Sequence, residues 1–277
     1  MQPEHSRSPD LREAGDDALR DYVGSLRERY PLDAIRRRAA RRRGVRRAIG
    51  GTALCAVLGA FAWQADPAWR VEQVSTPVGG HLDRRLADGT RLVLNTDSAV
   101  YFESRLHSRR LSVERGEAYV EVAHEALRPL MTRAGALQIR DIGTAFTVRR
   151  DAALTQVGVS SGAVEVALAG QPARRLDAGQ ALDADGGRLG DPHALPADAL
   201  AWVQGRLSFD AVPLRTAAAE LQRYRAAPIR VAPDAAALKL SGQFNSGNVE
   251  TLLDLLPRVL PVHVTRAADG AVLIAHR

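Results

Sequence analysis

The sequence has one cysteine and few aromatic residues. Of the 277 residues, only Cys55 is a cysteine, and 5% are aromatic. A single cysteine excludes a disulfide within the chain and a metal site built from several thiolates. The seven histidines show no ligand spacing such as His-x3-His, so we expect no metal and no cofactor. A folded core must therefore be built from valine, leucine, isoleucine and alanine.

Lysine is nearly absent, and arginine carries the positive charge. Lys239 is the only lysine, and the formal net charge is +6. Eight arginines lie between Arg36 and Arg47 with no acidic residue among them. A basic chain often binds nucleic acid. Here the excess is one short block beside an apolar run, which is typical of membrane topology, so we expect no direct contact with nucleic acid.

The apolar run covers residues 48–65 and carries no charge. It is just long enough to cross a hydrocarbon core of ~30 Å as a helix. We therefore predict one transmembrane helix, with a cytoplasmic arm (1–47) before it and the rest of the chain in the periplasm, because the arginine block precedes the run. One alternative is a cleavable export signal, since Ala60-Phe61-Ala62 matches a small-x-small cleavage pattern. The other is a soluble protein in which this run is a buried helix rich in alanine and glycine.

The arm over residues 1–47 contains a helix signal. Ser8-Pro9-Asp10 supplies a capping hydroxyl, a proline at the first helical position and an acid. One face of the helix would then carry Leu11, Leu19, Tyr22 and Leu26. A single helix cannot bury its own apolar stripe. It either docks on a partner, another copy or the membrane, or the arm is a disordered tether.

Residues 70–191 alternate between apolar and polar positions over short runs. Examples are RLVLN, AVYFE, RLSVE, AYVEVA and AVEVALA, separated by turn signals such as Ala87-Asp88-Gly89-Thr90 and Asp185-Gly186-Gly187. Period-2 runs bounded by glycine and aspartate predict strands. We expect an all-β domain here, built as a sandwich, a roll or a solenoid-like stack.

Residues 205–277 change to a mixed pattern. Helices are predicted over 213–224 and 249–260, with short strands between and around them, in the order βαββαββ. This order indicates a small α+β module with both helices on one face of a small sheet. The second helix carries more leucine than one face can hide, so Leu252, Leu256 and Val259 are candidates for contact with a partner.

An ordered series of segments resembles the periplasmic domain of FecR-type sigma-factor regulators. The segments are Leu86-Ala87-Asp88-Gly89-Thr90, GEAYVEVA (116–123), IGTAFTV (142–148) and SGAVEV (161–166), followed by Arg206-Leu207-Ser208-Phe209. The tail from about residue 205 resembles the short domain shared by secretins and TonB-dependent receptors. Together the resemblance covers roughly residues 70–277.

The resemblance implies a single-pass inner-membrane signal transducer. Such proteins regulate an extracytoplasmic-function sigma factor in response to a TonB-dependent outer-membrane transporter of iron chelates. On this interpretation Leu11, Leu19, Tyr22 and Leu26 would contact the sigma factor. The transporter's signalling domain would contact Leu252, Leu256 and Val259. The alternative is an exported β-rich envelope protein with its signal removed and no sigma partner.

No catalytic constellation is present in the sequence. It contains no nucleophile elbow, no phosphate-binding loop and no His-Glu-x-x-His. An enzyme acting on envelope material would need a polar cluster that the sequence does not show, so we expect no enzyme activity on other molecules. The resemblance does imply one reaction, because some members cut themselves at a Gly-Thr pair that Gly143-Thr144 matches. The other interpretation of the pair is an ordinary glycine turn.

Overall fold

The structure is a computed structural model of the full chain. It describes residues 19–26, 29, 41, 51, 54–125, 127–141, 143–152 and 154–277. Two compact units are present, Met1–Ala65 and Asp66–Arg277, and each is considered separately below.

The first unit contains helical segments at residues 19–26 and 54–65. Nowhere in the described part of the chain is a helix both long enough and apolar enough to cross a membrane. The predicted transmembrane helix over 48–65 is therefore wrong. Its continuous described part, 54–65, would span about 18 Å at 1.5 Å per residue, short of a core of ~30 Å. Residues 48–50, 52 and 53 lie outside the described residues.

The second unit begins with a β domain, in which the described residues form fourteen strands. They are β1 (Ala68–Ser75), β2 (Leu82–Arg85), β3 (Arg91–Leu94), β4 (Ala99–Arg105), β5 (Arg109–Glu121), β6 (Leu130–Ala134), β7 (Leu137–Asp141), β8 (Ala145–Asp151), β9 (Leu154–Ser161), β10 (Ala163–Ala167), β11 (Arg174–Asp177), β12 (Gln180–Asp185), β13 (Arg188–Leu189) and β14 (His193–Ala194).

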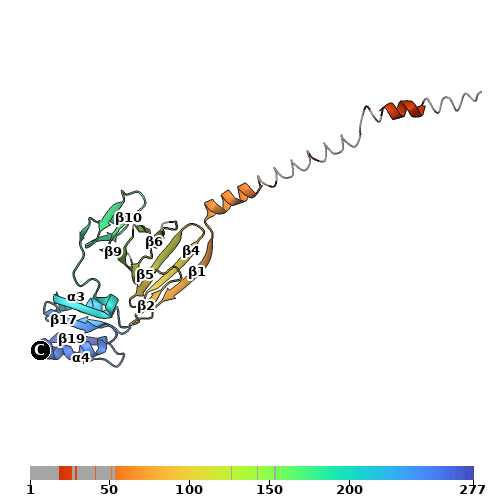
Figure 1. Ribbon diagram of the computed structural model, residues 1–277. Helices are drawn as coiled ribbons and strands as arrows, with labels where there is room; N and C mark the ends of the chain where they lie inside the picture. Colours follow the sequence, from red (N-terminus) through yellow and green to blue (C-terminus); the bar gives the residue numbers. More distant parts are fainter. Residues whose placement is uncertain are drawn as a thin grey trace, which may run out of the picture. The chain divides into compact units, whose positions relative to one another are not determined.

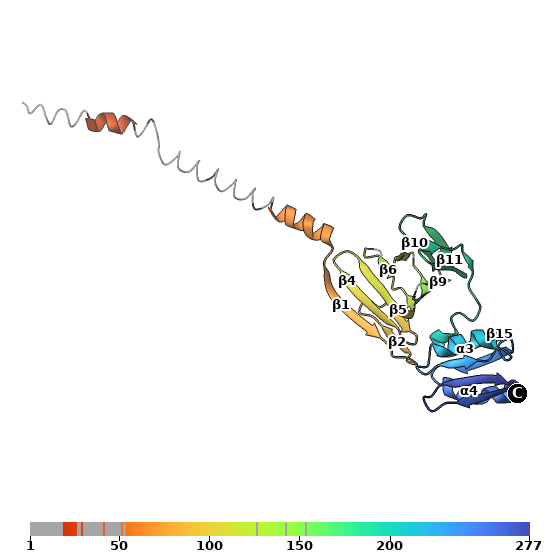
Figure 2. The ribbon, with the colours of Figure 1, turned by 180° about the vertical axis from the view of Figure 1, so that it is seen from behind.

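The strands form one continuous sheet that is shared through β5. The first half of β5 pairs with β4 and β6, and its second half pairs with β3 and β8. On one side the order runs β1-β4-β5-β6-β7-β10-β11, and on the other β2-β3-β5-β8-β9-β12. Figures 1 and 2 show β1 beside β4 and β5, with β10 at the opposite side of the domain. The predicted segments RLSVE and AYVEVA are thus two halves of one strand.

Gly116 is the point at which β5 passes from one half of the sheet to the other. Its φ is +78°, a region that residues with a Cβ rarely adopt. Val113 faces Val100 of β4 before this point, and Ala118 faces Leu94 of β3 after it. The glycine therefore allows one 13-residue strand to pair with strands of both halves of the sheet.

Side chains from both halves of the sheet meet in one hydrophobic core. Its fully buried members include Leu92, Leu94, Val100, Leu111, Val120, Ile139, Phe146, Val148, Val157, Val164, Leu176 and Leu182. Phe102 and Phe146 are the only phenylalanines among them, and aliphatic residues supply the rest of the cluster. Burial on one side of each strand explains the period-2 pattern of the sequence.

The C-terminal module follows a short 3-10 helix, η1 (Ala201–Gln204). Its elements are β15 (Arg206–Pro213), α3 (Leu214–Gln222), β16 (Ile229–Val231), β17 (Lys239–Asn245), α4 (Val249–Val259), β18 (Val262–Arg266) and β19 (Val272–His276). This is the predicted order of helices and strands. Local chemistry sets the start of α4, where the Asn248 side chain accepts a hydrogen bond from Thr251 N at 3.3 Å.

The module contains two sheets rather than the one predicted. β15 pairs with β17, and β16-β19-β18 form a separate three-stranded sheet in which β16 and β19 are parallel. A single hydrophobic cluster joins both sheets to both helices through residues such as Leu207, Leu221, Leu256 and Ile274. Strand partners depend on long-range contacts, so the order of elements alone could not distinguish one sheet from two. Figure 1 shows α3, α4, β17 and β19 together at the C-terminal end.

Candidate functional site

A buried ion pair joins the β domain to the C-terminal module. Glu117 belongs to β5, and Arg223 lies directly after α3. A guanidinium nitrogen of Arg223 lies 2.8 Å from Glu117 Oε2, and their side chains are only 14% and 8% exposed. Glu117 Oε2 also accepts a hydrogen bond from Asn95 Nδ2 at 2.9 Å. The carboxylate is therefore held by groups from both parts of the second unit.

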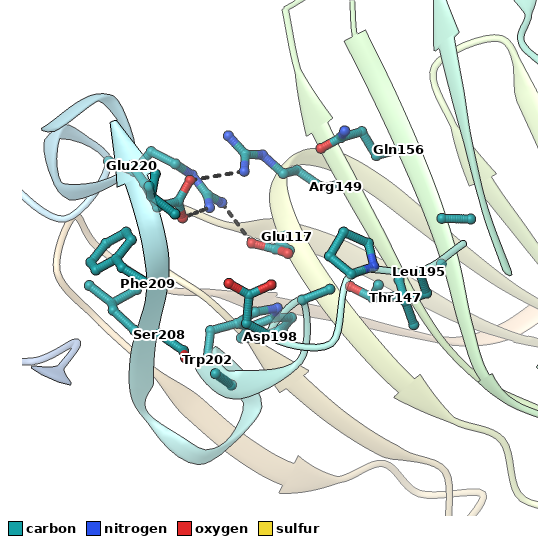
Figure 3. A pocket seen from close by; sticks show the side chains of 18 of the residues that line it. Glu117, Thr147, Arg149, Gln156, Leu195, Asp198, Trp202, Ser208, Phe209 and Glu220 are labelled. Carbon is teal, nitrogen blue, oxygen red and sulfur yellow. Dashed lines mark hydrogen bonds and ion pairs between the residues drawn. The ribbon is translucent and has the colours of Figure 1, made fainter. Parts of the chain in front are cut away.

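Glu220 extends this pair into a network of four charged side chains. Its two carboxylate oxygens lie 2.5 Å from Arg223 Nη1 and 3.0 Å from Arg149 Nη1 of β8. Figure 3 shows Glu117, Arg149 and Glu220 of this network beside a cavity. Burial disfavours the charged form of Arg223, but the carboxylates of Glu117 and Glu220 outweigh it and raise the pKa of Arg223 above its ordinary value. Arg223 therefore remains charged at every physiological pH.

Uncharged contacts hold the same end of α3 against the β domain. The Thr96 hydroxyl donates to the carbonyl oxygen of Arg223 at 2.9 Å and accepts from Gly79 N at 2.8 Å. Together with the charged network, these bonds fix how the module docks on the β domain. A movement of the module can therefore be transmitted through these contacts to β5, the strand common to both halves of the sheet.

A cavity of about 410 Å³ lies beside the charged network. Strands β8, β9 and β12, the linker after β14, β15 and α3 all contribute to its walls. Trp202 is 5% exposed and lines the cavity, and its indole Nε1 has no hydrogen-bond partner among the described residues. Asp198, on the same linker, also lines the cavity, as Figure 3 shows.

Sequence reasoning did not single out the charged network or the cavity. Glu117, Arg149 and Glu220 stand in ordinary strand and helix patterns, tens of residues apart. Only the fold brings them together, and no short motif marks them. Among the described residues, no group of histidine, cysteine and acidic side chains is placed to hold a metal ion.

Gly143 and Thr144 lie in the turn between β7 and β8. Gly143 has φ +89°, and its N–H donates to Asp141 Oδ1 at 3.0 Å. The hydroxyl of the buried Thr144 donates to the same carboxylate oxygen. Asp141 is thus placed to accept the hydroxyl proton. The same bonds also stabilise an ordinary turn, so the geometry is compatible with both interpretations of the pair.

The residues predicted to bind a sigma factor are exposed where they are described. Leu19, Tyr22 and Leu26 lie on the helical segment 19–26, and all three side chains are exposed to solvent. Leu11 lies outside the described residues. The segment therefore presents an apolar face that no described residue of its own unit covers.

The residues predicted to bind a transporter divide into two groups. Leu252 and Leu256 are buried in the module core, where they pack with residues of both sheets. Val259, near the end of α4, is exposed. Of the three, only Val259 offers its side chain to a partner without unfolding the module.

Residues 72–165 match the family described as "FecR protein". The resemblance expected from the sequence is thereby confirmed for this part of the chain, which runs from within β1 to within β10. No curated protein matches the sequence significantly.

Two crystal structures have a similar fold, each of a candidate anti-sigma factor from Parabacteroides distasonis ATCC 8503. The one at 2.50 Å shares 21% identical residues, has a TM-score of 0.60 and covers 75% of this chain and 100% of its own. The structure at 1.65 Å resolution also shares 21% identical residues and has a TM-score of 0.61. The match covers 74% of this chain and 99% of the chain in that structure. At this identity the likeness establishes the fold.

Proposed function

We propose that this chain regulates a sigma factor of the extracytoplasmic-function class. The observation that carries the proposal is the FecR match over residues 72–165. The fold shared with two candidate anti-sigma factors supports it. The exposed apolar face of the segment 19–26 supplies a surface on which a sigma factor can dock, since an amphipathic helix needs a partner to cover its stripe.

A double variant tests the docking face. Leu19→Asp with Leu26→Asp places two charges on the apolar face of the segment 19–26 and is expected to abolish sigma binding. Burying even one carboxylate in an apolar groove without a partner costs several kcal/mol, on the order of a hundredfold or more in affinity. The measurement is co-purification of sigma factors with the chain, together with transcript levels in the source bacterium.

The matched control is Arg20→Asp, which changes the net charge by the same amount on a residue outside the apolar face. It is expected to leave sigma binding largely intact. If the double variant and the control both behave as the wild type, the sigma proposal fails. The exported β-rich envelope protein without a sigma partner then becomes the better interpretation.

The finer proposal concerns the origin of the signal. The second unit would work in the periplasm and respond to the signalling domain of a TonB-dependent outer-membrane transporter. The exposed Val259 of α4 is the candidate contact. Protease added to spheroplasts tests the location. A photo-crosslinker at position 259 tests the contact, and failure to capture a transporter in cells supplied with an iron chelate would contradict it.

We also propose self-cleavage at Gly143-Thr144, for which the hydrogen bond from Thr144 to Asp141 supplies a proton acceptor. Asp141 accepts the hydroxyl proton while Thr144 Oγ1 attacks the carbonyl carbon of Gly143. The Gly143–Thr144 C–N bond breaks, the leaving amine takes up the proton, and an ester forms. Water then hydrolyses the ester to give a carboxylate at Gly143 and a free amine and hydroxyl at Thr144.

Cleavage would give two fragments, the second beginning at Thr144. Thr144→Ala is expected to give one intact chain, whereas Thr144→Ser keeps a hydroxyl and is expected to be cut. Asp141→Asn is expected to slow cleavage by about 10²–10⁴-fold, the usual contribution of a general base. Intact-mass spectrometry of the purified chain distinguishes these outcomes. An intact wild-type chain would show that the pair is an ordinary turn.

A further inference from the structure

β15 has one open edge. Its only partner is β17, and in the described residues no other strand lies beside it. Apart from this pairing, residues 206–212 form no hydrogen bond to another backbone group in the described chain, and only the Ala211 N–H is satisfied otherwise, by the Ser241 hydroxyl of β17 at 2.9 Å. In an antiparallel pair, alternate N–H and C=O groups point away from the partner. The open edge therefore offers a row of backbone donors and acceptors.

The cavity described above runs along this edge. Arg206, Leu207, Ser208 and Phe209 all line it. Side chains of successive strand residues point to opposite faces, so a cavity that meets all four lies at the edge of the strand. β17 contributes no residue to it. A second hollow of about 760 Å³ shares Asp198, Ala201, Arg206, Ser208 and Val212 with the cavity. It also meets Asp210 and Gln243 of β17, so it continues from the edge over one face of the β15–β17 pair.

The groove formed by these two hollows has polar groups that no described residue satisfies. The buried Trp202 Nε1 has no acceptor. Asp198 and Asp210 line the groove, and their carboxylates form no ion pair or hydrogen bond in the described chain. Leu195, Leu207 and Phe209 supply an apolar wall. A ligand that fits this groove needs a hydrogen-bond acceptor for Trp202 Nε1. It also needs a donor or a positive charge for the carboxylates of Asp198 and Asp210, and apolar surface against the wall.

We propose that this groove binds an extended peptide segment of a partner protein as an added strand on β15. An extended peptide supplies the backbone groups that an open edge needs. A peptide carbonyl would accept from Trp202 Nε1, and an apolar side chain would pack against the wall. An arginine or lysine of the segment would face Asp198 and Asp210. The groove includes neither a residue of the segment 19–26 nor Val259 of α4, so the proposal does not depend on sigma binding.

The test uses the purified full chain and an array of synthetic peptides. Each peptide alternates valine and threonine, with or without one central arginine, and is capped at both ends. We expect the arginine peptides to bind and their N-methylated versions, which lack the alternate N–H donors, to fail. Trp202→Phe removes the N–H but keeps an apolar ring, and we expect it to weaken binding about five- to tenfold, the effect of one hydrogen bond.

Asp198→Asn supplies a second variant that does not alter the apolar wall. It is expected to weaken the arginine peptides and to leave the arginine-free peptides unchanged. Two results would overturn the proposal: no peptide binds the wild type, or N-methylated peptides bind as well as the others. Concentration-dependent dimers lost in Trp202→Phe, without peptide binding, would show that a second copy occupies the edge and would also overturn it.

Discussion

Replacing Asp88 by asparagine is expected to lower the free energy of unfolding by about 3–5 kcal/mol. The reason is that the charged Arg109 guanidinium remains buried without its nearest counter-ion, and the remaining carboxylate, that of Glu125, lies 3.7 Å away and is 31% exposed. Arg109 Nη1 lies 2.6 Å from Asp88 Oδ2, and the two side chains are only 2% and 4% exposed. Arg109 also donates from Nε to the carbonyl oxygen of Arg128 at 2.8 Å. Neutral bonds of this kind do not replace the lost charge. Denaturant unfolding of the purified chain measures the effect.

The chain offers a matched control at its surface. Arg91 Nη2 lies 2.7 Å from Asp83 Oδ2, nearly the same separation, but these side chains are 33% and 43% exposed. Asp83→Asn is therefore expected to cost less than about 1 kcal/mol, because solvent already screens the pair. Equal losses in the two variants would show that burial of Arg109 does not set the effect.

Gly116→Ala is expected to produce the second large loss of stability. At φ +78° an alanine pays about 1–2 kcal/mol of backbone strain. Its Cβ would also lie 2.3 Å from Ser98 Oγ and 2.6 Å from the carbonyl oxygen of Asp97. Ser98 is fully buried, so relieving that overlap is expected to add about 1–3 kcal/mol. Thermal unfolding of the variant gives the total.

A variant at Gly187 distinguishes backbone strain from steric overlap with Ser98, the two contributions to this loss of stability. It has the same φ of +78°, but an added Cβ would meet nothing within 4 Å. Gly187→Ala is expected to show the strain alone. If Gly116→Ala costs no more than Gly187→Ala, then Ser98 moves aside freely and the crossing of β5 tolerates a side chain.

Much of the local structure could be predicted from the sequence. The helices predicted over 213–224 and 249–260 are α3 and α4, and the elements after residue 205 occur in the predicted order. The turn Ala87-Asp88-Gly89-Thr90 also occurs where it was expected, with Gly89 at φ +87° and the Asp88 carboxylate accepting from Thr90 N. The FecR resemblance rested on the same short segments. The prediction of a transmembrane helix failed because it relied on length and lack of charge alone.

What the sequence determined by itself was the position of strands, turns and helices, because alternation, glycine and capping act within a few residues. Only the tertiary structure decided which segments pair, which leucines of α4 are buried and that Arg109 lies inside the core. It also decided that Glu117 meets Arg223, 106 residues away, and that β15 keeps an open edge beside Trp202. These features depend on contacts between distant parts of the chain, which leave no local pattern to read.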